Sequence, residues 1–143
     1  REELEKNNFL NTIIMPYSVK YASSLYGPFR SALQNSSINI DKRTYQQDFH
    51  NRKEAMLEIQ LDIEEGADLV IIKPAGFYTD IIYEASKNFN IPIIGYQVSG
   101  EYTMLFNQGE NIIYESLVSL KRAGCNGIIT YFSEYIAKNI KMN

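Results

Sequence analysis

The stretch that decides the fold is residues 65–74, which read Glu-Gly-Ala-Asp-Leu-Val-Ile-Ile-Lys-Pro. A glycine suited to ending a helix is followed by a short turn and then by four consecutive aliphatic residues. Residues 123–129, Ala-Gly-Cys-Asn-Gly-Ile-Ile, repeat this order of helix end, turn and apolar run. Because the apolar positions are continuous rather than alternating, we expect strands buried on both faces, as in a parallel sheet covered by helices.

The rest of the chain continues this alternation. Apolar, β-branched segments predict strands at 12–20, 68–73, 91–98 and 127–132. Apolar residues at helical spacing predict helices over 51–65, 79–89, 110–123 and 134–141. Strands that alternate with helices form right-handed βαβ units, which build both doubly wound sheets and (β/α)8 barrels. No domain boundary is visible, so we treat residues 1–143 as part of one α/β domain.

Composition excludes several classes of protein. The chain has 143 residues, of which 45% are hydrophobic and 22% charged, with a formal net charge of -3. This content of apolar residues argues against disorder, and the absence of a basic cluster argues against a nucleic-acid partner. The longest aliphatic run is too short to cross a membrane, and the first residues resemble no signal peptide. We therefore expect a soluble, cytoplasmic protein without a nucleic-acid or membrane partner.

A polar segment at about 30–49 interrupts the alternation. It follows the expected end of the first strand, where α/β proteins place their chemistry. Long irregular segments in compact domains are often lids or binding loops. Arg30, Lys42 and Arg43 could close over an anionic ligand there, although solvated loop charges are the commoner explanation.

Two lysines stand at equivalent positions. Lys20 ends the first expected strand, and Lys73 ends the second. The carboxyl ends of parallel strands lie at one edge, so the two amines could be neighbours. Burial and a second cation both lower the pKa of a lysine, and a neutral amine can form a Schiff base with a ketone. The alternative is that each lysine extends into solvent or pairs with a carboxylate.

Other polar residues allow both a functional and an ordinary interpretation. Ser99 follows the third expected strand, and Tyr131 follows the apolar residues of the fourth. Both could hold a carboxylate, or could be a turn serine and an interface tyrosine. Glu58, with acids four residues before and after it, could hold Mg²⁺ with water, or could belong to a solvated acidic stripe. Cys125 is expected to be a buried small residue and His50 a capping or surface residue.

Several of these motifs resemble one family, porphobilinogen synthase, which is also called 5-aminolevulinate dehydratase. Residues 17–23 (Tyr-Ser-Val-Lys-Tyr-Ala-Ser) and 26–30 (Tyr-Gly-Pro-Phe-Arg) resemble its first lysine segment. Residues 65–74 resemble its second lysine segment. Residues 96–102 (Tyr-Gln-Val-Ser-Gly-Glu-Tyr), 121–124 and 130–131 complete the resemblance, which covers nearly the whole chain in order.

The resemblance implies an enzyme that condenses two molecules of 5-aminolevulinate into porphobilinogen with loss of water, in tetrapyrrole (heme) biosynthesis. It implies that Lys73 and Lys20 hold the two substrates as Schiff bases. Ser99 and Tyr131 would bind the carboxylate of the first substrate. Other groups would bind the second carboxylate or line the pocket, namely Arg30, Lys42, Gln46, Phe29, Tyr26 and Tyr96. Lys42 stands where many members have arginine, and this substitution removes a bidentate carboxylate contact.

The resemblance also implies an allosteric Mg²⁺ at Glu58 and a homo-oligomer, usually an octamer. Any Zn²⁺ would have to be bound by residues outside this chain. Family members are more than twice as long, so the expected fold is the C-terminal half of a (β/α)8 barrel, with about four βα units. The segment between Met104 and Glu115 is also shorter than its counterpart in relatives, by about two helical turns.

Two alternatives stay open beside the synthase. The chain could be a non-catalytic half-barrel or interaction module that needs the missing half. It could also be a fragment of another Schiff-base enzyme, such as an aldolase-like barrel, although the second lysine and the lid motif argue against this.

Overall fold

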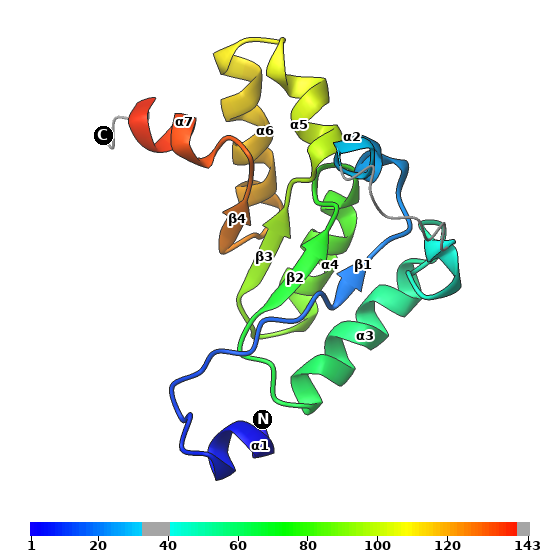
Figure 1. Ribbon diagram of the computed structural model, residues 1–143, viewed down its shortest axis with the longest axis vertical. Helices are drawn as coiled ribbons and strands as arrows, with labels where there is room; N and C mark the ends of the chain where they lie inside the picture. The colour runs from blue at the N-terminus through cyan, green and yellow to red at the C-terminus, as the bar shows by residue number, and fades with distance from the viewer. Residues whose placement is uncertain (33–40, 140–143) are drawn as a thin grey trace.

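The computed structural model describes residues 1–32 and 41–139 (Figure 1). Its four strands form one parallel sheet in the order β1-β2-β3-β4. The strands are β1 (Val19–Lys20), β2 (Val70–Lys73), β3 (Ile93–Tyr96) and β4 (Gly127–Ile129). All four carboxyl ends therefore lie at one edge of the sheet.

Seven α-helices occur in the described residues. They are α1 (Glu2–Lys6), α2 (Gly27–Ala32), α3 (Arg52–Glu64), α4 (Thr79–Asn88), α5 (Ser99–Phe106), α6 (Glu110–Ala123) and α7 (Ser133–Asn139). Short 3-10 turns occur as η1 (Ser24–Tyr26), η2 (Lys42–Thr44) and η3 (Gly76–Tyr78). Helices α3, α4 and α6 each precede the next strand of the sheet and pack beside one another (Figure 1).

The order of the strands distinguishes the two architectures that the sequence left open. Strands adjacent in the chain are also adjacent in the sheet, and the order never reverses. Right-handed crossovers then place every connecting helix on the same face, as in a barrel, whereas a doubly wound sheet has a reversal and helices on both faces. The expected fold, half of a (β/α)8 barrel built from about four βα units, is confirmed.

The core lies between the sheet and this helical layer. Aliphatic side chains from the strands meet small and aliphatic residues of the helices, and all of them are almost fully buried. They include Val19, Val70, Ile72, Ile93, Ala55, Ile59, Ile82, Ala85 and Leu120. Gly66 (φ +95°) and Gly124 (φ +126°) directly follow the last turns of α3 and α6, as predicted, in a conformation that favours glycine.

The expected strands were too long. Only residues 19–20 of the segment 12–20 form a regular ladder, while the preceding residues run alongside β2 with isolated hydrogen bonds to Ile14 and Pro16 carbonyls. Proline at position 16 has no N–H to donate to a ladder. The fourth strand ends at Ile129, because the Thr130 side chain accepts a hydrogen bond from the Phe132 N–H and closes a turn.

Helix α5 was not predicted. The sequence indicated only a strand end at Ser99–Gly100, yet a helix begins there. The Glu101 carboxylate, at the third helical position, accepts a hydrogen bond from the Val98 N–H at 2.6 Å, which is half of a capping box.

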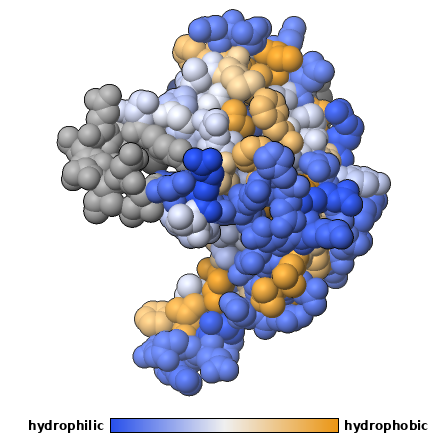
Figure 2. Space-filling model, turned by 90° about the vertical axis from the view of Figure 1, so that its right-hand side faces the viewer, coloured by the Kyte–Doolittle hydropathy of each residue, from blue (hydrophilic) through white to orange (hydrophobic). Residues whose placement is uncertain are grey.

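Apolar side chains remain exposed in the segment between α1 and β1. Phe9, Leu10 and Ile13 are 59%, 66% and 67% exposed, and Figure 2 shows hydrophobic surface on the segment that extends below the body of the molecule. Over residues 1–32 and 41–139, no helix combines the length and the apolar character needed to cross a membrane.

Candidate functional site at the strand ends

The two lysines lie opposite each other at the carboxyl ends of β1 and β2. Lys20 and Lys73 are register partners, and the N–H of Tyr21 donates to the carbonyl of Lys73 at 3.1 Å. The parallel ladder thus fixes the spacing of the two backbones. This register places the two lysines side by side, as expected from the sequence.

Tyrosine rings surround the two amines. The Nζ atom of Lys73 lies 3.6 Å from the ring centroid of Tyr96, 4.9 Å from that of Tyr17 and 5.7 Å from that of Tyr26. The Nζ atom of Lys20 lies 5.2 Å from the centroid of the same Tyr17 ring. Aromatic faces attract a cation, and within residues 1–32 and 41–139 neither lysine forms a salt bridge with a carboxylate.

The surroundings of both amines favour their neutral form. Burial lowers the pKa of Lys73, and the nearby Lys20 ammonium lowers it further. Burial also lowers the pKa of Lys20, to which the charge of Lys42 contributes. A lowered pKa increases the fraction of neutral amine at neutral pH, and the neutral amine is the nucleophile that attacks a carbonyl.

The next two strand ends supply hydroxyl groups. Ser99 begins α5 directly beyond β3 and is 9% exposed, whereas Tyr131 follows β4 and is 50% exposed. Burial raises the pKa of Tyr96, and Tyr131 and Tyr17 raise it further. Tyr131 therefore lies close to the Tyr96 ring, which faces the Lys73 amine.

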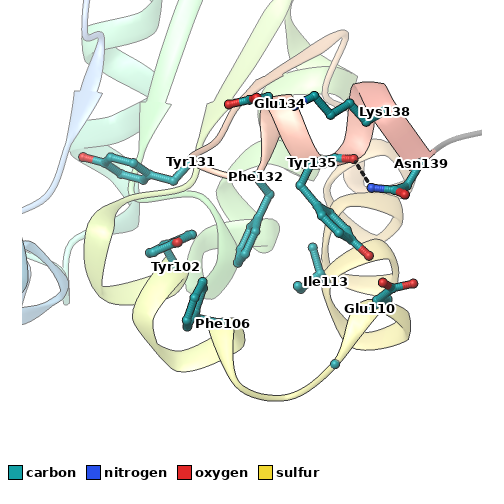
Figure 3. Close-up of a pocket in the computed structure, with 11 residues that line it drawn as sticks. Tyr102, Phe106, Glu110, Ile113, Tyr131, Phe132, Glu134, Tyr135, Lys138 and Asn139 are labelled. Carbon is teal, nitrogen blue, oxygen red and sulfur yellow. Dashed lines mark hydrogen bonds and ion pairs between the residues drawn. The ribbon is translucent and has the colours of Figure 1, made fainter.

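A pocket of about 460 Å³ opens behind Tyr131. Figure 3 shows Tyr102, Phe106 and Phe132 grouped in this pocket, with Tyr131 at its edge and its hydroxyl pointing away from them. The ring centroids of Tyr102 and Tyr131 are 5.5 Å apart. This aromatic cluster supports the Tyr131 ring from one side and leaves its hydroxyl directed away.

The second half of the expected lid is attached to the edge of β1. The Gln47 side chain accepts a hydrogen bond from the Lys20 N–H at 3.0 Å, and the backbone N–H of Gln47 donates to the Lys20 carbonyl at 3.1 Å. Its neighbour Gln46 is 8% exposed, and its Oε1 has no hydrogen-bond partner among the described residues. Gln46 thus carries a buried amide directly before the residue that binds the Lys20 backbone, while Lys42 lies on the exposed turn η2.

Part of the lid lies outside the described residues. Residues 33–40 are not described. Phe29 and Arg30 belong to α2 by their backbone, but their side chains are outside the description, so their expected roles stay predictions.

The structure does not bring Glu58 to the strand ends. It lies half-buried in the middle of α3, in the helical layer (Figure 1). Glu54, four residues earlier, exchanges hydrogen bonds with the helix cap Asn51. Across residues 1–32 and 41–139, no three His, Cys, Asp or Glu side chains are grouped to hold a metal ion. The acidic stripe therefore provides no set of three ligands within the described residues.

The histidine and the cysteine behave as expected. His50 is exposed, and its Nδ1 lies 2.7 Å from the Asp48 carboxylate. Cys125 is 3% exposed, and burial raises the pKa of its thiol to about 11. A buried thiol with a raised pKa is not placed to act as a nucleophile.

Four residues of the site were missed by sequence reasoning. Tyr17 touches both amines, Gln47 holds the backbone of Lys20, and Glu101 bonds the backbone beyond β2 and β3. Gln97 bonds the hydroxyls of Thr130 and Ser116, at 2.7 Å and 3.2 Å. For Gln97 the available signal was a single polar residue within an otherwise apolar run, whereas the other three stand in mixed sequence without such a signal.

Comparison with known proteins identifies one family. A family model described as delta-aminolevulinic acid dehydratase matches residues 1–139. A delta-aminolevulinic acid dehydratase of Archaeoglobus fulgidus is 48% identical over 99% of this chain and 46% of its own length. One from Methanothermus sociabilis is 51% identical over 98% of this chain, and one from Bacillus subtilis 46% identical over 96%.

A solved structure of the same family has a similar fold. The crystal structure of the delta-aminolevulinic acid dehydratase (porphobilinogen synthase) from Toxoplasma gondii, in complex with its reaction product porphobilinogen, has a TM-score of 0.89 to this chain at 40% identity. It covers 96% of this chain, which covers 42% of the Toxoplasma chain. The chain thus spans less than half the length of the relatives it matches.

Proposed function

The chain belongs to the delta-aminolevulinic acid dehydratase family, and we propose that it supplies both substrate-binding lysines of a porphobilinogen synthase. The reaction condenses two molecules of 5-aminolevulinate into porphobilinogen and releases two molecules of water, as a step of tetrapyrrole (heme) synthesis. The observation that carries this proposal is the pairing of Lys20 with Lys73 at adjacent strand ends, with both amines against Tyr17.

In the proposed mechanism Lys73 acts first. Its neutral amine attacks the ketone carbon of one 5-aminolevulinate and, after loss of water, forms a Schiff base. The hydroxyls of Ser99 and Tyr131, beyond β3 and β4, bind the carboxylate of this substrate. Burial of Lys73 and the charge of Lys20 support this role, because both lower the pKa of the attacking amine.

Lys20 holds the second 5-aminolevulinate in the same way. Lys42 and the buried amide of Gln46 bind its carboxylate, together with Arg30, while Phe29, Tyr26 and Tyr96 line the pocket. Fixing both ketones on adjacent strands turns a reaction between two free molecules into a local one, for which effective concentrations are very high. Proton transfers fall to the lysines, tyrosine hydroxyls and water, while the exposed His50 is paired with Asp48.

The proposal includes a metal and an assembly. Glu58 would give one carboxylate to an Mg²⁺ outside the reaction site, with water and a second subunit as further ligands. This ion would influence activity from a distance, and no reaction step passes through it. A cytoplasmic homo-oligomer, an octamer by the family's pattern, completes the proposal.

Porphobilinogen formation tests the catalytic roles. The assay uses the chain alone and the chain joined to the upstream half of the Bacillus subtilis relative, since the chain spans 45% of that protein. Lys73→Met is expected to abolish product formation, and Lys87→Met, at an exposed lysine of α4, to retain it. Product formation by folded Lys73→Met would refute the assignment.

A second candidate function is that of a non-catalytic half-barrel that pairs with another chain. The observation that favours it is the open sheet, with Ile13, Met15 and Tyr17 exposed by 67%, 43% and 49% beside β1. Native mass measurement is the test. Obligate pairing predicts an oligomer or complex, and a stable monomer of 16.5 kDa would exclude it.

A further inference from the structure

A buried carboxylate links the ends of β2 and β3. Glu101 is 4% exposed and lies in the first turn of α5. Its Oε2 accepts a hydrogen bond from the Val98 N–H, directly beyond β3, at 2.6 Å. Its Oε1 accepts a hydrogen bond from the Gly76 N–H, three residues beyond Lys73. One side chain therefore ties the segment after Lys73, at the end of β2, to the helix that begins with Ser99.

The fit around this carboxylate is close. A Cβ atom on Gly76 would lie 2.5 Å from Glu101 Oε1, so the absence of a side chain at position 76 allows the contact. Hydrogen bonds to backbone N–H groups, including that of Ala75, favour the ionised carboxylate, while burial has the larger, opposite effect and raises the pKa of Glu101. Burial of a carboxylate is costly unless hydrogen bonds compensate for the lost water, and here the backbone N–H groups of Gly76 and Val98 do so.

We propose that Glu101 is a positioning residue, which holds the backbone beyond Lys73 in register with Ser99 so that the Lys73 amine stays against Tyr96. The catalytic importance of this positioning rests on the proposed function. The contacts of Glu101 and Lys73 do not depend on it. Releasing the loop would let Lys73 leave its aromatic surroundings and become more solvated, while Lys20 would keep the hydrogen bonds of its own strand.

Two variants separate positioning from folding. In Glu101→Gln one oxygen becomes an NH₂ group, which faces a backbone N–H, so one of the two segments is released. In Gly76→Ala the new methyl group displaces Oε1 but leaves the acid and its bond to Val98. Glu115→Gln, at an exposed glutamate of α6, is the matched control.

The test follows two reactions on each folded variant of the full chain. Reductive methylation by formaldehyde and cyanoborohydride, followed by peptide mass mapping over a pH series, reports the reactivity of Lys73 and Lys20 without any substrate. We expect the ratio of methylation at Lys73 to methylation at Lys20, at neutral pH, to fall by about threefold or more in Glu101→Gln and Gly76→Ala. The reason is that each unit by which the pKa of Lys73 rises lowers its fraction of neutral amine by about tenfold. Glu115→Gln should keep the ratio of the unchanged protein.

Three results would overturn the inference: an unchanged ratio in folded variants, an equal loss at both lysines, or a loss of folding in both variants. The last result would make Glu101 a residue of the fold and not of the site. The second reaction, trapping of 5-aminolevulinate by borohydride, is separate. Its failure on Lys73 in the unchanged protein would refute the proposed function while leaving the methylation result to judge Glu101.

Discussion

Replacement of Gly100 by alanine perturbs the contact between α5 and the turn before α2. Gly100 is buried in the first turn of α5, and a Cβ atom there would lie 2.7 Å from the Cα and 2.9 Å from the carbonyl carbon of Leu25, with the Leu25 oxygen nearer still. These are backbone atoms, which cannot rotate away. The methyl group must therefore push α5, which carries Ser99, away from η1, which carries Tyr26.

Two opposing free energies set the size of the effect. Alanine is favoured over glycine inside a helix by about 1 kcal/mol. Overpacking of a buried contact costs about 1–3 kcal/mol, and contact with rigid backbone belongs at the upper end of that range. The free energy of unfolding should therefore fall by about 2 kcal/mol. For a chain of this length, such a loss lowers the Tm by about 6 °C.

Gly27→Ala provides the control. Gly27 has an ordinary helical φ of -50° at the start of α2, and nothing lies within 4 Å of its Cβ position. Thermal unfolding followed by circular dichroism should show an unchanged or slightly higher Tm for this variant and a lower one for Gly100→Ala. A Gly100→Ala protein as stable as the unchanged one, or an equal loss in both variants, would refute the packing of α5 described above.

Three other predictions follow from single contacts. Gln97→Leu should lower the free energy of unfolding by about 1–2 kcal/mol in urea titrations, because buried hydrogen bonds to two hydroxyls are lost; an unchanged midpoint would contradict this. The pH midpoint of Lys73 modification by formaldehyde should lie below the ordinary lysine pKa of 10.5. Lys20→Met should raise that pH midpoint, since removal of a neighbouring cation favours the ammonium form of Lys73. A lower midpoint in Lys20→Met would contradict the effect assigned to Lys20. Cys125 should resist iodoacetamide in the folded protein and react after denaturation, as its burial and raised pKa require, and rapid alkylation without denaturant would contradict its place in the core.

The architecture could be predicted from the sequence because it depends on local patterns. Continuous aliphatic runs such as 69–72 and helix-ending glycines such as Gly66 fix four βα units whatever surrounds them. Lengths of elements depend on more than pattern. The first strand lost most of its expected length because Pro16 cannot donate, and α5 arose where a buried carboxylate caps the chain.

The site shows the same division. Lys20 and Lys73 were predicted as neighbours because parallel strands bring their carboxyl ends to one edge. Tyr17 and Glu101 could not be assigned, because their roles depend on which loops meet across the sheet. Glu58 stayed with the helical layer, as its position in the middle of α3 requires. Contacts between segments distant in sequence are therefore what the sequence leaves undetermined.

The most direct test of the central claim is the trapping of the Schiff base on Lys73. The chain, completed by the upstream half of the Bacillus subtilis relative, is incubated with 5-aminolevulinate, reduced with borohydride, digested and mapped by mass. The account predicts one reduced 5-aminolevulinate on the peptide that contains Lys73. A folded, complete barrel that carries no adduct on Lys73, or carries it on an exposed lysine such as Lys87 instead, would contradict the account.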